Sequence, residues 1–124
     1  MFLQSDPVFE CVLPVDLKPQ NTGRGNAWFM TAKVRQQYMA ALADHVREPF
    51  DFPAGVLYTR IRGPRQRAWD NDNLALACKQ LQDTLTELGW WYDDSAAWLQ
   101  LIGYRHAEER GDFPAVMVSV WELQ

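Results

Sequence analysis

The alternation of apolar and polar side chains predicts a strand near the start of the chain, a helix after it and then a second strand. Residues 7–15 alternate with period two, as a half-buried strand does. Residues 16–30 are rich in turn formers and predict a loop. A helix from Thr31 to Glu48 follows, because its apolar stripe recurs at helical spacing: Val34, Tyr38, Ala41, Leu42 and His45. Residues 55–62 alternate again and predict a strand with basic side chains towards its end.

The second half of the chain predicts one more helix and two more strands. Three capping residues, Asp70 to Asp72, mark the helix start, and Gly89 marks its end. Its buried face would contain Leu74, Ala77, Cys78, Leu81, Leu85 and Leu88. Strands are then expected over 97–105 and 115–122, with the polar loop 106–114 between them.

The order β-α-β-α-β-β predicts an α+β fold with a mixed sheet. Each strand-helix-strand passage favours parallel neighbours, and the last two strands would form an antiparallel hairpin. A length of 124 residues suits one domain over 1–124.

The overall charge argues against nucleic acid as a partner, but its distribution argues for it. The net charge is −4. Residues 1–67 hold nine Lys or Arg against six Asp or Glu, whereas residues 68–124 hold three against ten. Four arginines lie just before the first acidic cluster and predict phosphate contacts: Arg60, Arg62, Arg65 and Arg67.

Two function classes are disfavoured by the sequence. No stretch has the roughly 18 apolar residues that a membrane span needs, and the first ten residues do not read as a secretion signal, so we expect a cytoplasmic protein with no membrane partner. Cys11 and Cys78 have no neighbouring cysteine or histidine at ligand spacing, which argues against structural zinc.

The run WDNDNL, residues 69–74, is the most informative segment for chemistry. Carboxylate oxygens are the ligands that Mg²⁺ prefers in nucleases. Asp70 and Asp72 would point about 200° apart if both were helical, so a shared ion requires Asp70 to be extended and to precede the helix. Asp94 could join them only if the strand after it pairs with the strand that ends near Arg62.

The ordered set of residues over about 60–105 resembles the RusA family of Holliday junction resolvases. The shared elements are an Asp-x-Asp-Asn-Leu motif after a basic stretch, then a lysine and an aspartate on the next helix, a glycine and an Asp-Asp pair. Here these are Asp70, Asp72, Asn73, Leu74, Lys79, Asp83, Gly89, Asp93 and Asp94. The lysine departs from the best-known members, because the position one turn after Asp72 is Leu76 and the lysine comes three residues later. More loosely, the loop residues Pro19, Asn21 and Arg24 resemble a family loop after the first strand.

The resemblance implies a Mg²⁺-dependent endonuclease, with Mn²⁺ as a substitute ion, that cuts four-way or otherwise branched DNA in recombination and repair. By the same resemblance Asp70, Asp72 and Asp94 are the metal ligands, Asp93 supports them, and Lys79 lies near the scissile phosphate. The DNA contacts would come from the arginine run and from Lys18 and Arg24. Two symmetric cuts imply a homodimer. The source would be a bacterium, a phage or a prophage.

Plainer interpretations stay open for each feature. The Asp-x-Asp pair would also serve as a helix cap, and Lys79 with Asp83 as an i,i+4 ion pair. The arginines would also suit a solvated strand end, and the tryptophans Trp69, Trp90 and Trp91 suit the core unless one stacks on an unpaired base. A branched-DNA-binding protein without catalysis is the main rival function. A nuclease acting on flaps or on RNA would use the same residues.

Overall fold

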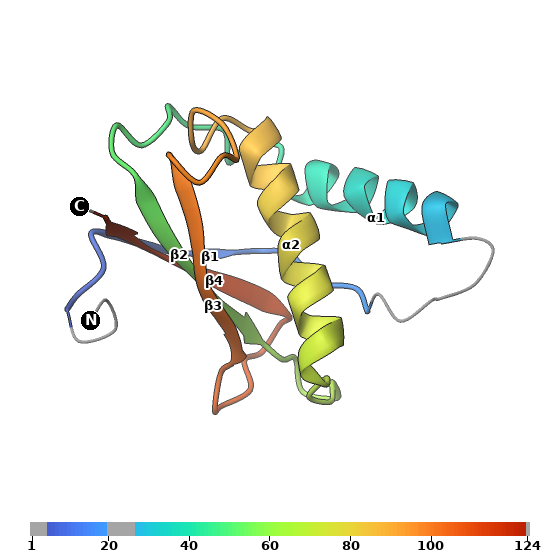
Figure 1. Cartoon of the computed structure of the whole chain (residues 1–124). Helices are drawn as coiled ribbons and strands as arrows, with labels where there is room; N and C mark the ends of the chain where they lie inside the picture. The colour runs from blue at the N-terminus through green and yellow to red at the C-terminus, as the bar shows by residue number, and fades with distance from the viewer. Residues whose placement is uncertain (1–4, 20–26, 124) are drawn as a thin grey trace.

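The computed structural model describes residues 5–19 and 27–123, which form one small α+β domain. Its elements follow the order β1 (Phe9–Leu13), α1 (Ala27–Ala41), β2 (Ala54–Ile61), α2 (Asn71–Glu87), β3 (Leu99–His106) and β4 (Ala115–Glu122). Figure 1 shows both helices on the same side of a four-stranded sheet. The predicted fold class and element order are therefore confirmed. No helix within the described ranges is long and apolar enough to cross a membrane.

The strand order in the sheet is β1-β4-β2-β3. β2 and β3 are parallel neighbours, as the strand-helix-strand passage predicts, whereas β4 is antiparallel to both β1 and β2. The predicted hairpin of the last two strands is wrong, because β4 crosses to the centre of the sheet. The reason lies in burial: Val116, Val118 and Val120 are fully buried, while much of β3 is exposed. The most apolar strand takes the central place and β3 takes an edge.

The first helix is displaced from its predicted bounds. α1 begins at Ala27 instead of Thr31 and ends at Ala41 instead of Glu48. After a turn, the chain runs on outside the helix and carries Arg47 against three aromatic rings, with its guanidinium carbon 3.7 Å from the centre of the Phe50 ring. This cation-π contact with a packed aromatic cluster outweighs the helical propensity of residues 42–48.

α2 buries its apolar face against the sheet as predicted. Leu81 and Leu85 are fully buried, and so are Val56 and Tyr58 of β2 on the sheet face below them. The Tyr58 hydroxyl donates a hydrogen bond of 3.1 Å to the amide oxygen of Gln82, so the one polar atom of that buried ring has a partner. Burial raises the pKa of Tyr58 well above its ordinary value, which keeps the hydroxyl protonated.

Gly89 ends α2, as the sequence predicts, with a positive φ of 88°. An added Cβ would meet the Arg47 carbonyl oxygen at 3.1 Å. Gly89→Ala is therefore expected to lower the free energy of unfolding by about 1 kcal/mol or more. Urea denaturation measures this change. The control is Gly103→Ala, whose new Cβ would lie 3.5 Å from the nearest atom, and which we expect to change stability by less than about 0.5 kcal/mol. Equal effects would refute the conformational argument.

Candidate metal and DNA site

The two motif aspartates lie at the N-terminus of α2. Asp70 is the N-cap in an extended conformation, with φ −67° and ψ 166°, and Asp72 is in the first turn. One carboxylate oxygen of Asp70 accepts a 2.8 Å hydrogen bond from the backbone N–H of Asn73. Both aspartates are exposed. A shared ion requires an extended Asp70 before a helical Asp72, and the structure has this local arrangement. Asp70 is also the helix cap.

A buried arginine holds the segment that leads into Asp70. Arg60 is only 2% exposed. Its guanidinium donates a 2.9 Å hydrogen bond to the Arg67 carbonyl oxygen and lies 3.6 Å from the centre of the Trp69 ring. Arg60, one of the four arginines predicted to contact phosphate, is thus buried and engaged within the protein. The Trp69 ring lies over Arg60 at the end of β2. Arg60 in turn positions the residues that precede the motif.

His106 supports the same segment from the neighbouring strand. Its Nε2 accepts a 3.0 Å hydrogen bond from the Trp69 backbone N–H. His106 and Arg60 are register partners at the carboxyl ends of the parallel strands β3 and β2. Two side chains from adjacent strands therefore hold the segment before Asp70: His106 contacts the Trp69 backbone, and Arg60 contacts the Trp69 ring and the Arg67 carbonyl oxygen.

Electrostatics favours the neutral form of this histidine. Burial lowers the pKa of His106 below its ordinary value near 6.5, and the charges of Arg60 and Arg62 lower it further, while the contact with the Trp69 backbone acts in the opposite direction. Burial also lowers the pKa of Arg60, although Asp16 opposes that shift. A neutral imidazole is the form that can accept the Trp69 N–H at Nε2.

The depressed pKa of His106 makes a pH-dependent contribution to stability. As pH falls below about 6.5, the unfolded chain takes up a proton at this histidine before the folded chain does, so stability falls until the folded-state pKa is passed. His106→Gln keeps an acceptor but does not titrate. We expect its thermal midpoint to fall less than the native one between pH 7.5 and pH 5. Identical profiles for native protein and His106→Gln would contradict the prediction.

The loop after β1 lies against the loop before α2. Gln66 donates a 2.9 Å hydrogen bond to one Asp16 carboxylate oxygen, and Lys18 approaches the other at 3.3 Å. The Lys18 backbone N–H in turn donates to the Tyr38 hydroxyl. Lys18, a predicted DNA contact, is thus joined to the loop before α2 through Asp16, with which it forms an ion pair. Arg24, the other predicted contact in this loop, lies outside the described residues.

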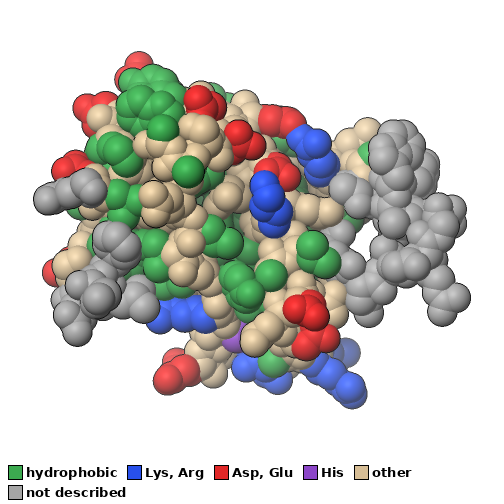
Figure 2. Space-filling view, viewed as in Figure 1, with side chains coloured by type: hydrophobic (Ala, Val, Ile, Leu, Met, Phe, Trp, Pro, Cys, Tyr) green, Lys and Arg blue, Asp and Glu red, His purple; other side chains and the backbone are tan. Residues whose placement is uncertain are grey.

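Basic side chains from separate segments surround the start of α2. Arg65 and Arg67 are exposed, and Arg62 is partly exposed. Arg110, from the loop before β4, joins them through a 3.0 Å hydrogen bond to the Gln66 carbonyl oxygen. Figure 2 shows basic side chains gathered at the lower end of the molecule, where α2 begins in Figure 1. We call Arg62, Arg65, Arg67 and Arg110 the basic rim.

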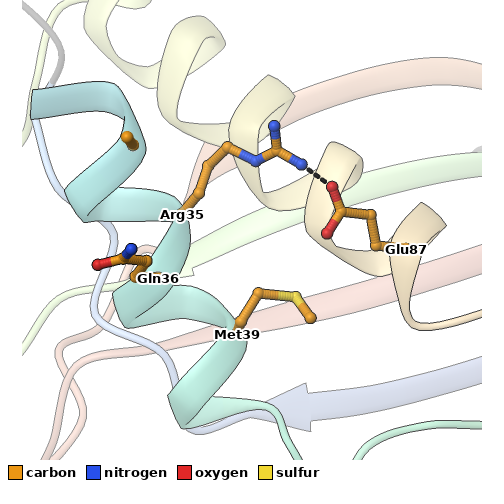
Figure 3. A pocket seen from close by; sticks show the side chains of 5 residues that line it. Arg35, Gln36, Met39 and Glu87 are labelled. Atoms are coloured by element: carbon orange, nitrogen blue, oxygen red, sulfur yellow. Dashed lines mark ion pairs between the residues drawn. The ribbon is translucent and has the colours of Figure 1, made fainter. Parts of the chain in front are cut away.

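The other motif residues lie towards the opposite end of α2. Lys79 forms a 2.9 Å ion pair with Asp83. Asp94 lines a shallow hollow together with Lys79 and Asp83, and the hollow also includes Glu87 and Arg35. Figure 3 shows Arg35 of α1 paired with Glu87 of α2, so this hollow lies where the two helices meet. Asp93 is turned to its own loop, where it accepts a 2.8 Å hydrogen bond from the Ser95 N–H. Hydrogen bonds from the Ser95 side chain and, to a lesser extent, from its backbone lower the pKa of Asp93.

The described chain does not bring the three predicted metal ligands together. Asp72 and Asp83 are eleven residues apart on one helix, which corresponds to about 16 Å along its axis. Asp94 lies beside Asp83 and so is far from Asp72. β3 does pair with β2, which was the condition for Asp94 to join Asp70 and Asp72, but this pairing does not bring Asp94 to them. Among residues 5–19 and 27–123, no group of three or more His, Cys, Asp or Glu side chains is placed to hold a metal ion. Lys79 is about 10 Å along the axis from Asp72 and is engaged elsewhere.

Sequence reasoning missed three contributors to the α2 N-terminus: Asp16, Gln66 and His106. Nothing local marks them, because each reaches the site through pairing between distant segments. Trp90 and Trp91, which we expected in the core, are each 2% exposed, whereas Trp69 is partly buried under Arg60.

No family model matches the chain, and no curated protein matches it either. The functional interpretation therefore depends on the ordered motif and on the geometry around the start of α2.

Proposed function

We propose that the protein is a Mg²⁺-dependent endonuclease that cuts four-way or otherwise branched DNA in a bacterial cell, encoded by the bacterium, a phage or a prophage. The observation that supports this most is the position of Asp70 and Asp72. They are exposed at one helix terminus, beside the basic rim. A pair of carboxylates next to phosphate-binding cations is the arrangement that metal-dependent phosphodiester hydrolysis uses.

The residues present suit a partly hydrated Mg²⁺ ion. Mg²⁺ is commonly held by one or two carboxylates, with water and substrate phosphate completing its shell. The Asp70 oxygen that accepts from Asn73 is used for capping, which leaves its other oxygen and the Asp72 carboxylate as donors. Mn²⁺ would suit the same oxygens. When bound, the ion would lower the pKa of a coordinated water and neutralise phosphate charge. Asp93, Asp94 and Lys79 of the same chain lie too far along α2 to contribute to this pair.

The basic rim would bind the DNA backbone. Its four arginines come from two loops that meet beside the α2 N-terminus, so their charges are concentrated despite the net charge of −4. Arginine forms paired hydrogen bonds with phosphate oxygens, and such contacts position a duplex without reading its sequence. Arg60, His106 and Gln66 would fix the loop that carries Arg65 and Arg67. Two symmetric cuts across a junction require two such sites, so the proposal includes a homodimer.

A branched-DNA-binding protein without catalysis is the second candidate. The separation of Asp94 from Asp70 and Asp72 favours it, because the resemblance implies three ligands and the chain supplies two in one place. Under this alternative the basic rim would bind the junction, and the aspartates would only cap α2.

A nicking assay on a labelled synthetic four-way junction separates the two candidates. The native protein is incubated with Mg²⁺, with Mn²⁺ or with a chelator, and linear duplex, flap and RNA substrates serve as comparisons. The proposal predicts paired, symmetric nicks in the junction that require the metal. Binding without nicking under every metal condition would favour the non-catalytic alternative. Cleavage confined to flaps or RNA would refute the proposed substrate.

A further inference from the structure

The loop between β3 and β4 presents a phenylalanine to solvent. Phe113 is 78% exposed, which makes it the most exposed of the large hydrophobic side chains in the described ranges. It is not isolated, because it lines an apolar hollow with Val12, Ile61 and Ala115, and Val12 is itself 56% exposed. A group of exposed apolar side chains, unlike a single one, indicates a binding surface.

The protein holds this loop against the segment that carries the basic rim. The Gly111 N–H donates a 2.9 Å hydrogen bond to the Arg62 carbonyl oxygen. Pro114 lies against Gly63, where an added Cβ would be only 3.1 Å from the proline ring. The backbone is therefore anchored on both sides of Phe113, so the exposed ring projects from a defined position.

Arginines of the basic rim lie next to the hollow. Arg110 precedes Phe113 by three residues and is bonded to the loop that carries Arg65. A second hollow, lined by Arg65 and Gln66, shares Pro114 with the first. Figure 1 shows the β3–β4 loop at the lower end of the molecule, where α2 also begins. A DNA backbone that contacts Arg65 and Arg110 would thus pass beside the Phe113 ring.

The hollow itself suits a base better than a phosphate. Asp112 is the one ionisable side chain that lines it, and its negative charge repels phosphate. A carboxylate accepts hydrogen bonds from the exocyclic amino group of a base such as cytosine. The flat ring of Phe113 offers a surface on which a base can stack. The charges of the basic rim and of the hollow are therefore complementary to the two parts of a nucleotide.

We propose that this hollow, which we call the base site, binds one unpaired base at the branch point of the DNA. The base stacks on the Phe113 ring and turns its amino edge to Asp112. The inference rests on the proposed function and names the feature of the substrate that the protein recognises. Bases of a linear duplex are paired and stacked on one another, so removing one costs more free energy than at a branch point. The base site would favour branched DNA, whereas the basic rim would bind the backbone of either form.

Binding in the presence of a chelator tests the base site without catalysis. Fluorescence anisotropy gives the affinity for a labelled synthetic four-way junction and for a linear duplex with the sequence of one arm. Phe113→Leu should lower junction affinity by about 10-fold, because leucine is apolar but has no ring for stacking. Duplex affinity should change by less than about twofold, since the basic rim is intact. Phe113→Tyr keeps the ring and should bind the junction as the native chain does.

Tyr92→Leu is the matched control. Tyr92 is an aromatic residue that is 57% exposed, and it lies after the C-terminal end of α2, away from the basic rim. Its loss should leave junction and duplex affinity at the native values. Circular dichroism checks folding, which the Phe113 variants should retain because that side chain is mostly in solvent.

Photocrosslinking shows where the base lies. An iodinated cytosine at the branch point should crosslink to Phe113 on irradiation, and mass spectrometry of the peptide that follows Arg110 identifies the site. The same nucleotide in the middle of an arm should not crosslink there. Native junction affinity in Phe113→Leu, or a branch-point crosslink confined to other residues, would overturn the proposal and leave the hollow as a surface for another protein chain.

The failure of the base site and the failure of the nuclease can be told apart. Binding in chelator requires no metal, so a junction preference that depends on the Phe113 ring supports the base site even if no nicking occurs. Metal-dependent nicking of the junction by a Phe113→Leu variant with native junction affinity would support the nuclease and overturn the base site. A native chain that binds neither junction nor duplex would overturn both.

Discussion

Replacing Asp72 with asparagine is expected to lower the rate of junction nicking by at least about 100-fold while junction binding stays close to native. Asparagine has the shape of aspartate but lacks the negative charge that a hard divalent cation requires. Changes to groups that only support metal ligands already cost 10 to 100-fold in affinity or activity, so the loss of a direct ligand should reach at least the upper end of that range. Single-turnover nicking measures the rate, and a gel shift in chelator measures binding.

The fold should tolerate this change. Asp72 is exposed in the first turn of α2, where an acidic side chain contributes less than about 1 kcal/mol through the helix dipole. Asp51→Asn, an exposed aspartate just before β2 at the far end of that strand from the site, is the matched control and should nick at the native rate. Native nicking by Asp72→Asn would exclude the proposed ligand.

Asp94→Asn addresses the third carboxylate. If the Asp94→Asn variant still nicks the junction, Asp70 and Asp72 are sufficient as protein ligands of the ion, as the geometry of one chain suggests. Loss of nicking, with binding and folding intact, would show that Asp94 takes part in catalysis, as the family resemblance implies. It would then have to reach the pair by a rearrangement or from another copy, since it lies beside Asp83 on the same chain.

Arg60→Met is expected to lower the free energy of unfolding by roughly 2–4 kcal/mol and to reduce nicking. The variant loses the contact with the Trp69 ring, worth about 1–2 kcal/mol for a desolvated pair, and leaves the Arg67 carbonyl without its donor, at about 1–3 kcal/mol. Without this support, the segment that carries Asp70 would be less well positioned. Urea denaturation and the nicking assay measure the two effects.

Two further arginine variants separate packing from DNA binding. Arg60→Lys keeps the charge but not the planar group that stacks on Trp69, so its stability should lie between those of the native protein and Arg60→Met. Arg65→Met, in the exposed part of the same loop, should change stability by less than about 0.5 kcal/mol and should instead weaken DNA binding. The dependence of DNA affinity on salt concentration should fall by the amount expected for the loss of about one phosphate contact. Equal stability of Arg60→Met and native protein would contradict the positioning role.

The secondary structure was largely predictable because it depends on neighbours in sequence. The period of two predicted β4 as residues 115–122 and the helical period predicted α2 to within about two residues at each end. The C-terminal end of α1 was not predictable, since the chain leaves the helix to place Arg47 on Phe50, a contact that no local pattern contains.

Assembly of the candidate site was predictable only where it is local. The extended Asp70 before a helical Asp72 follows from capping, which involves residues three apart. Asp94 was expected to lie beside Asp70 and Asp72, and within one chain it does not. These residues lie towards opposite ends of α2, and the length of the helix keeps them apart whatever the order of the motif residues. The contact of His106 with Trp69 depends on the parallel register that makes His106 the partner of Arg60.

By itself the sequence determined six elements, the cap and the glycine stop of α2, and the concentration of basic charge before the acidic motif. Only the tertiary structure decided that β4 lies at the centre of the sheet, that Arg60 is buried and that the carboxylates divide between the two ends of α2. Backbone preference and amphipathic spacing act over a few residues, so they are visible in a sequence. The strand order and the convergence of side chains depend on contacts between distant segments, which form only when the whole core packs.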